Sequence, residues 1–351
     1  MVFSVGMVIP FQGPGGIYGP SAQAVTELAV AEINMQGGIL GEEVRAEIID
    51  GGAPLRAVRA QVAELLLRGQ IQALGGWHIS SVRHALAPLV DRRVPYVYPA
   101  LYEGGEYRHG LYCTGERPSN QVKPALRWLR EHAGARRWFV IGDDYVWPRR
   151  SFQTVAAQAP DLGISIAGSI FADPSGRENE SGMATAVQAV ARSGCDAVLV
   201  LMVGQNAVAF NQAFSDAGLH ERILRFSPLM EENMLLATGI GGTENLFSAG
   251  AYFRSLATGD AIGLIDRYVS LHGQWAPALN GPAESCYEGL FALQAIINNA
   301  GSADVDATDR VVDGLAYVGP RGLVEFVGNQ AKQQLYLSAA AGFDFDIITA
   351  L

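Results

Sequence analysis

The stretch that decides the fold class consists of two segments, Ala73-Leu-Gly-Gly-Trp-His-Ile-Ser-Ser81 and Val94-Pro-Tyr-Val-Tyr-Pro-Ala-Leu-Tyr-Glu-Gly-Gly-Glu-Tyr107, joined by an amphipathic segment. Its alternation of apolar runs and polar loops predicts the order strand, loop, helix, strand, loop. Because crossover connections between parallel strands are right-handed, both loops are expected at the same edge of one sheet. Ligands of open α/β sheets bind beyond the carboxyl ends of the strands. We therefore expect residues 77–81 and 98–102 to line a ligand site.

The same alternation extends over the first hundred residues. Apolar strands are predicted near Val5, Val44 and Ile71, and the segments after Pro20 and Pro54 carry apolar residues at helical spacing. The resulting order βαβαβαβ predicts a parallel sheet with helices on both faces.

A second series of helices and strands begins at residues 120–132. A chain of 351 residues is also long for a single hydrophobic core, so two domains are expected. The predicted fold class is therefore α/β with two parallel sheets. Residues 115–120 and 246–253 interrupt the alternation and are predicted to cross between the domains.

The composition excludes several classes of protein. A net charge of −10 with only two lysines argues against nucleic-acid binding, which requires clustered cationic side chains. No apolar run approaches the ~20 residues of a membrane-spanning helix, so no direct membrane insertion is expected. The three cysteines, Cys113, Cys195 and Cys286, are far apart and odd in number, which indicates buried thiols instead of a disulfide scaffold.

The first residues of the chain have neither a charged n-region nor an apolar h-region, so we predict no signal peptide within this sequence. Two interpretations of its location stay open. The chain is either a cytoplasmic protein or the mature form of an exported one.

The sequence predicts no cofactor, no metal ion and no catalytic residue. The glycine-rich segment at residues 13–19 fails the G-x-G-x-x-G spacing at Tyr18, and its Pro14 lacks a backbone donor. The six histidines lack the spacing of a metal-binding helix, and no G-x-S-x-G motif occurs. The predicted alternative for residues 13–19 is a tight turn bordering a cleft.

Ser80 and Ser81 follow a strand and open a helix, where hydroxyls and unpaired backbone N–H groups can hold a carbonyl or carboxylate oxygen. A plain N-cap is the structural alternative. Acidic residues occupy similar loops in the second half, among them Asp143 and Glu231. They are predicted either to meet an amino group or amide N–H of a ligand or to favour a helix N-terminus.

Aromatic residues gather at predicted strand ends and in the loops that follow them. Tyrosine and tryptophan offer an apolar wall with a polar edge, which suits a small ligand in a dry slot. These aromatic residues are Trp77, Tyr98, Tyr102, Tyr145, Trp147 and Tyr252.

Several segments together resemble one known family. They are Gly6-Met-Val-Ile-Pro-Phe-Gln-Gly-Pro14, Ala29-Val-Ala-Glu-Ile-Asn34, Gly37-Gly-Ile-Leu-Gly41, Tyr98-Pro-Ala-Leu-Tyr-Glu-Gly104, Gly142-Asp-Asp-Tyr-Val-Trp-Pro-Arg149, Ala249-Gly-Ala-Tyr-Phe253 and Gly319-Pro-Arg-Gly322. On these segments, essentially the whole chain resembles the type I periplasmic binding proteins of branched-chain amino acid ABC transporters. It is most similar to their amide- and urea-binding branch, which includes the cytoplasmic amide sensor of the amidase operon.

The resemblance implies two Rossmann-like lobes with parallel sheets, joined by three crossing segments, with the ligand in the cleft. The first lobe is expected to comprise residues 1–117 and 250–325, and the second residues 118–249 and 326–351. The third crossing is expected near residues 317–330.

The resemblance also implies a set of ligand-binding residues. In the first lobe they are Trp77, His78, Ser80, Ser81, Tyr98, Ala100, Leu101 and Tyr102; in the second they are Tyr145, Trp147, Met202, Leu229 and Glu231. Ala100 stands where relatives usually have a threonine or serine, which removes one hydrogen bond worth ~1 kcal/mol or more. We therefore expect a ligand more apolar or aromatic than acetamide or urea.

The function implied is that of a non-catalytic solute-binding protein. It would capture a small, partly apolar amino acid, amide or related carboxylate or carbonyl compound and deliver it to the membrane permease of an ABC importer, with the mature form in the periplasm. The alternative is a cytoplasmic ligand-sensing regulator on the same scaffold. An enzyme is the third interpretation.

Overall fold

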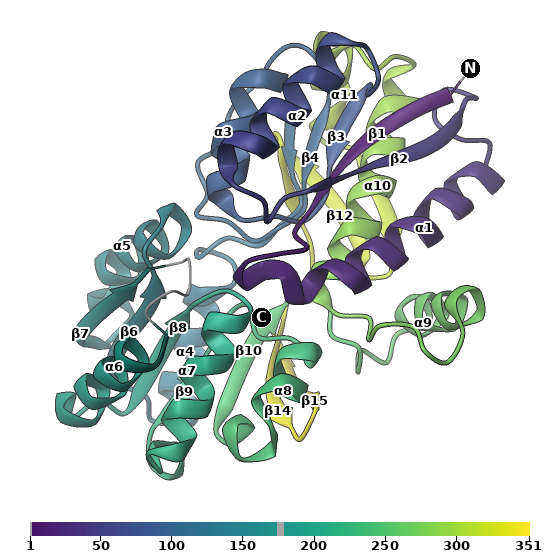
Figure 1. Ribbon diagram of the computed structural model, residues 1–351. Helices are drawn as coiled ribbons and strands as arrows, with labels where there is room; N and C mark the ends of the chain where they lie inside the picture. The colour runs from purple at the N-terminus through teal and green to yellow at the C-terminus, as the bar shows by residue number, and fades with distance from the viewer. Residues whose placement is uncertain (1, 174–178) are drawn as a thin grey trace. The chain divides into compact units, whose positions relative to one another are not determined.

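The structure is a computed structural model that describes residues 2–173 and 179–351. The chain divides into two compact units (Figure 1). The first unit comprises residues 1–101, 105–115 and 256–334, and the second comprises residues 102–104, 116–255 and 335–351.

The first unit is built on a mixed sheet in which β13, β5, β4, β3, β1 and β2 are parallel neighbours. The strands β11 and β12 extend one edge by antiparallel pairing. In spatial order the strands are β11 (Ala316–Gly319), β12 (Gly322–Val327), β13 (Gln330–Lys332), β5 (Leu111–Cys113), β4 (Tyr96–Tyr98), β3 (Ala73–Gly75), β1 (Val2–Ile9) and β2 (Glu43–Asp50).

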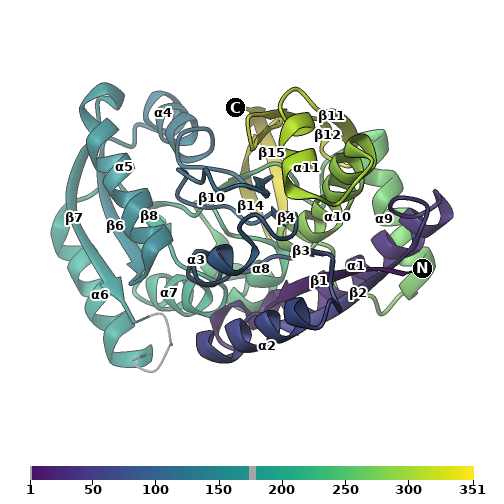
Figure 2. The same ribbon diagram turned by 90° about the horizontal axis from the view of Figure 1, so that it is seen from above.

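Helices cover both faces of this sheet. The chain moves from β1 to β2 in one direction and from β2 to β3 and β4 in the other, so right-handed crossovers place α1 opposite α2 and α3. Figures 1 and 2 show this arrangement, with α10 beside α1. The helices are η1 (Pro14–Tyr18), α1 (Gly19–Met35), α2 (Leu55–Leu67), α3 (Ser80–Val90), α9 (Gly259–His272), α10 (Gly281–Ala300) and α11 (Val305–Val312).

The second unit has its own sheet, in which β10, β9, β8, β6 and β7 are parallel neighbours. The last two strands of the chain add to it antiparallel through β14. In spatial order the strands are β15 (Asp344–Ala350), β14 (Tyr336–Ala341), β10 (Leu246–Gly250), β9 (Leu224–Phe226), β8 (Ala197–Leu201), β6 (Arg137–Asp143) and β7 (Ser165–Ala172).

The same crossover rule places α5 on one face of this sheet and α6 and α7 on the other, since the chain reverses direction after β7. β8 is buried along its whole length, as a central parallel strand covered on both faces must be. The helices are α4 (Val122–His132), α5 (Val146–Leu162), α6 (Asn179–Ser193), α7 (Gln205–Asp216), η2 (Leu219–Glu221), α8 (Glu232–Thr238) and η3 (Ile240–Thr243).

The predicted α/β class with two mostly parallel sheets is confirmed, and the differences are local. α5 begins at Val146, six residues before its predicted start at Phe152; of the residues between them, Arg149 and Arg150 are exposed, whereas Trp147, Pro148 and Ser151 are buried. β11 and β13 were not predicted, since runs of four and three residues are too short for a period-two pattern.

The boundaries between the units also differ from those expected after residues 117, 249 and 325. The chain changes unit after Gly115, Ser255 and Gln334. The largest difference is at the third crossing: β12 continues to Val327 and β13 pairs with β5, which keeps residues 326–334 in the first unit.

The structure also bears on two features of the composition within the described residues. Cys113, Cys195 and Cys286 are buried, and none of them forms a disulfide bond. No helix of residues 2–173 and 179–351 combines the length and the apolar character needed to cross a membrane.

Candidate functional site

The first unit brings its predicted site residues to one sheet edge. Trp77, His78, Ser80 and Ser81 follow β3, and Tyr98, Ala100 and Leu101 end or follow β4. β3 and β4 are parallel neighbours, so the two loops lie together at their carboxyl ends. All of these residues except the half-buried Ser81 are buried.

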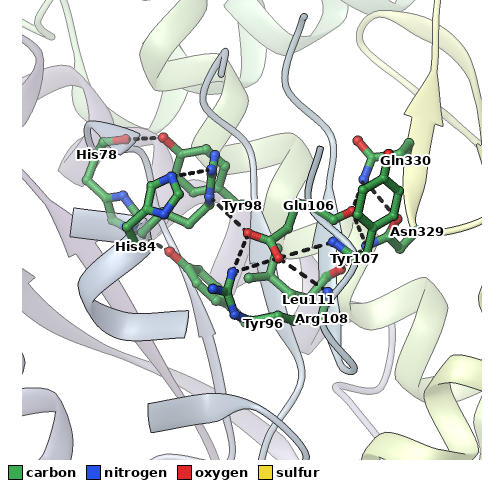
Figure 3. A network of polar contacts seen from close by, with 11 residues as sticks. His78, His84, Tyr96, Tyr98, Glu106, Tyr107, Arg108, Leu111, Asn329 and Gln330 are labelled. Atoms are coloured by element: carbon green, nitrogen blue, oxygen red, sulfur yellow. Dashed lines mark hydrogen bonds and ion pairs between the residues drawn. The ribbon is translucent and has the colours of Figure 1, made fainter. Parts of the chain in front are cut away.

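His78 lies at one end of a network of polar contacts (Figure 3). Its Nε2 atom lies 2.8 Å from the hydroxyl of Tyr96, and its carbonyl oxygen accepts a hydrogen bond of 2.7 Å from the hydroxyl of Tyr98. Complete burial lowers the pKa of His78 to about 3, so the ring is neutral at physiological pH. The hydroxyl of Tyr98 therefore fixes the loop after β3, and the ring of Tyr98 is a candidate wall of the ligand site.

The buried ion pair of Arg83 and Glu106 lies beside the ring of Tyr98. The guanidinium carbon of Arg83, on α3, lies 4.9 Å from the centroid of that ring. The Nε atom of Arg83 is 3.4 Å from Oε2 of Glu106, with side-chain exposures of only 1% and 3%. Nη1 of Arg108 donates to both carboxylate oxygens of Glu106 at 2.9 Å (Figure 3).

Sequence reasoning did not identify Arg83 or Glu106. Arg83 lies in an amphipathic segment where an arginine is ordinarily solvated, and Glu106 comes from a glycine-rich loop. Nothing in the local pattern signals that the two meet in the interior.

Ser80 is the most informative residue of the first unit. It is the first residue of α3, and Ile79 precedes it as the N-cap without a side-chain cap, so neither serine is the plain N-cap of the alternative interpretation. The Oγ atom of Ser80 is buried and has no hydrogen-bond partner among the residues that the structure describes. A buried hydroxyl without a partner costs free energy, and the start of a helix favours negative charge. This position is therefore suited to an oxygen of an anionic or carbonyl ligand.

The loop after β1 also reaches this edge, because β1 is the other neighbour of β3. Tyr18 and Trp77 pack edge to face with ring centroids 4.6 Å apart. The backbone N–H of Trp77 donates to Sγ of Cys286 at 3.3 Å. Trp77 is thus held in the core of its unit, and Tyr18 is a neighbour that the glycine-rich pattern did not indicate.

In the second unit, the predicted site residues lie at the carboxyl ends of three neighbouring parallel strands. Tyr145 and Trp147 follow β6, Met202 follows β8, and Leu229 and Glu231 follow β9. The rings of Tyr145 and Trp147 are 6.2 Å apart between centroids. The structure therefore brings these residues to one edge of the sheet.

Asp143 joins two of these loops. One carboxylate oxygen accepts a hydrogen bond of 2.8 Å from the backbone N–H of Val203, and the other accepts one of 2.8 Å from Nδ2 of Asn206. Burial raises the pKa of Asp143 to about 7. Asp143 thus positions the loop of Met202, which was not its predicted role.

Glu231 is the N-cap of α8, as in the alternative interpretation of these acids. Its Oε2 and Oε1 atoms accept hydrogen bonds from the backbone N–H groups of Asn233 at 2.9 Å and Met234 at 3.0 Å. Nε2 of Gln121 donates to the carbonyl oxygen of Pro228 at 2.9 Å and so fixes the turn that carries Leu229.

Tyr102 differs from its expected placement in the first lobe. Residues 102–104 group with the second unit, and the backbone N–H of Tyr102 donates to the carbonyl oxygen of Glu116 at 2.9 Å. Within residues 2–173 and 179–351 there is no cluster of three or more histidine, cysteine or acidic residues able to hold a metal ion.

Comparison with known proteins gives consistent results. The sequence profile of a family described as periplasmic binding protein matches residues 3–342. The Leu/Ile/Val-binding protein BraC3 of Rhizobium johnstonii is 41% identical over 145 residues, which span 40% of this chain and 39% of that protein.

Solved structures resemble the whole chain. A solute-binding protein of an ABC transporter from Rhodopseudomonas palustris HaA2, in complex with p-hydroxybenzoic acid, has a TM-score of 0.87 at 18% identity, over 100% of this chain and 97% of that one. The leucine-binding protein LivK of Thermotoga maritima MSB8 has a TM-score of 0.84 at 17% identity, over 99% and 98%. At these identities the likeness shows the fold. Because the family profile matches nearly its full length, the chain belongs to the periplasmic binding protein family.

Proposed function

We propose that this chain binds a small carboxylate with an apolar body and delivers it to an ABC importer. The observation that carries the proposal is Ser80, whose buried Oγ has no partner among the described residues and which opens α3. A carboxylate oxygen there would accept hydrogen bonds from the hydroxyl and the first backbone N–H groups of the helix. It would also lie at the positive end of the helix dipole.

The residues of the strand-end loops in each unit favour a solute with an apolar body. Tyr98 presents a ring whose hydroxyl is already bonded, and Ala100 adds no hydroxyl. In the second unit, Tyr145 and Trp147 supply further aromatic surface. We propose that aromatic rings of these loops lie against the apolar part of the solute.

We favour aromatic carboxylates over aliphatic amino acids because the strand-end loops carry the aromatic rings of Tyr98, Tyr145 and Trp147. Glu231 does not decide between them, since each of its oxygens accepts one backbone N–H group of α8 and can still accept a hydrogen bond from an ammonium group. Structurally similar proteins bind p-hydroxybenzoic acid and, in another case, benzoate. A branched-chain amino acid is the second candidate, because a Leu/Ile/Val-binding protein is 41% identical to this chain over 145 residues.

A thermal-shift panel tests the proposal. It includes benzoate, 4-hydroxybenzoate, leucine and isoleucine, together with the neutral compounds benzamide, acetamide and urea. A ligand at a hundred times its dissociation constant adds ~2.7 kcal/mol of stability. We expect the carboxylates to raise the unfolding midpoint and benzamide to have a much smaller effect. Equal shifts with benzoate and benzamide, or a shift with acetamide or urea alone, would contradict the carboxylate assignment.

Transport is favoured over the cytoplasmic regulator, since structurally similar proteins include solute-binding proteins of ABC transporters. We propose a periplasmic location and no chemical conversion of the solute. Fractionation of cells that express the natural gene checks the location. Incubation of the purified protein with esters and amides checks whether the solute is converted. Turnover that is lost in Ser80→Ala would overturn the proposal that the protein only binds its solute. The narrower similarity to the amide- and urea-binding branch stays a prediction.

A further inference from the structure

A groove on the first unit lies outside the residues described above. It has a volume of about 500 Å³ and runs between α2 and α3, which pack side by side (Figures 1 and 2). Its lining combines cationic and apolar side chains: Leu55, Arg56, Arg59, His84, Ala85 and Pro88.

Arg56 and Arg59 give this groove a cationic side. Arg56 and Arg59 are exposed on the first turns of α2, and no acidic side chain among the described residues forms an ion pair with either. By contrast, Arg68 at the other end of α2 pairs with Glu64 at 2.7 Å. In a chain of net charge −10, two adjacent arginines without acidic partners offer charge complementarity to an anionic group.

Helix α3, which forms the other side of the groove, connects the groove to the loops that hold Ser80 and Tyr98. Nη2 of Arg83 lies 3.1 Å from Nε2 of His84. Because an arginine can only donate, His84 Nε2 accepts this hydrogen bond. The guanidinium carbon of Arg83 also lies 4.9 Å from the centroid of the Tyr98 ring. A partner seated in the groove would therefore contact a helix whose first residue is the proposed carboxylate site.

We propose that this groove docks an acidic segment of the importer's membrane permease, an inference that rests on the proposed transport function. Carboxylates of the segment pair with Arg56 and Arg59, while its apolar side chains cover Leu55, Ala85 and Pro88. An anionic membrane surface fits less well. Binding to such a surface uses clusters of about four to eight cationic side chains, and a net charge of −10 opposes it.

The test measures binding of the fluorescently labelled chain to its own permease in phosphatidylcholine nanodiscs. The double variant Arg56→Glu with Arg59→Glu reverses the charge of the groove, and glutamate near a helix N-terminus is compatible with folding. Arg68→Glu is the matched control on the same helix. We expect the double variant to weaken permease binding at least about tenfold and to lessen its salt dependence, with little change in the control. Thermal shifts with benzoate and leucine should stay those of the wild type.

The outcomes separate this inference from the proposed function. If wild type binds the permease and the double variant binds equally well, the groove assignment is wrong and the transport proposal stands. If wild type does not bind the permease at all, both are overturned. Binding to phosphatidylglycerol vesicles that is lost in the double variant, with permease binding unchanged, would assign the groove to lipid instead.

Discussion

The loops at the carboxyl ends of the strands are stabilised by different polar groups in the two units. In the first unit, a neutral His78 and two tyrosine hydroxyls fix the loop after β3, above the buried pair of Arg83 and Glu106. In the second unit, buried carboxylates accept backbone N–H groups, with Asp143 joining two loops and Glu231 capping α8. Burial lowers the pKa of His78 and raises the pKa of Asp143, so these two groups respond to pH in opposite directions.

The largest expected effect comes from removing one partner of the buried ion pair. Glu106→Gln removes the negative charge that faces the Arg83 guanidinium at 3.4 Å, and the loss of one partner of a buried pair costs about 3 to 5 kcal/mol. Urea denaturation measures the change in the free energy of unfolding. The control Glu64→Gln breaks the exposed pair with Arg68 and should cost about 0 to 1 kcal/mol. Equal losses in the two variants would show that the buried pair does not stabilise the first unit.

Acidification should weaken the first unit through His78. The unfolded chain binds a proton below about pH 6.5, whereas the folded chain does so only near its pKa of about 3. The stability contributed by neutral His78 is thus present above pH 6.5 and lost as the pH falls, by about 2 kcal/mol between pH 7 and pH 5. His78→Gln should remove this part of the pH dependence. A variant with the wild-type dependence in urea titrations at both pH values would contradict this account.

Asp143 should give the reverse dependence in the second unit. Its folded pKa of about 7 exceeds the ordinary value of 3.8, so between these values the folded chain keeps a proton that the unfolded chain has lost. Stability from this group is present below pH 3.8 and falls as the pH rises to 7, by about 2 kcal/mol from pH 5 to pH 7. Asp143→Asn should abolish that decline, at a constant cost of ~1 kcal/mol for one hydrogen bond. The comparison between units fails if His78→Gln and Asp143→Asn shift the pH profile in the same direction.

The smallest expected effect concerns specificity. Ala100→Ser restores a hydroxyl at a buried position of the loop after β4. The serine hydroxyl can accept a hydrogen bond from the ammonium group of leucine, which benzoate lacks. One such hydrogen bond is worth ~1 kcal/mol, so affinity for leucine relative to benzoate should rise by about five- to tenfold. Calorimetric titration of both ligands measures the ratio. An unchanged ratio would remove Ala100 from the determinants of specificity.

The sequence predicted the placement of the strand-end loops better than the way in which they are supported. The alternation through β3 and β4 was enough to bring Ser80 and Tyr98 to one edge, because parallel topology and crossover handedness leave few choices. The partner of Arg83 could not be predicted, since Glu106 reaches it only through tertiary folding. Glu231 lay within reach of sequence reasoning as a helix N-cap, and its local bonds to Asn233 and Met234 agree with that interpretation.

The most direct test of the proposed site is calorimetric titration of 4-hydroxybenzoate into the wild type and the Ser80→Ala variant. Since the Ser80 hydroxyl is buried and has no partner among the described residues, the variant without ligand should unfold at or above the wild-type urea midpoint. Loss of a hydrogen bond to a charged oxygen, about 1.5 to 3 kcal/mol, predicts a dissociation constant raised at least about tenfold. Equal dissociation constants for the two proteins would contradict the assignment of the carboxylate to the start of α3.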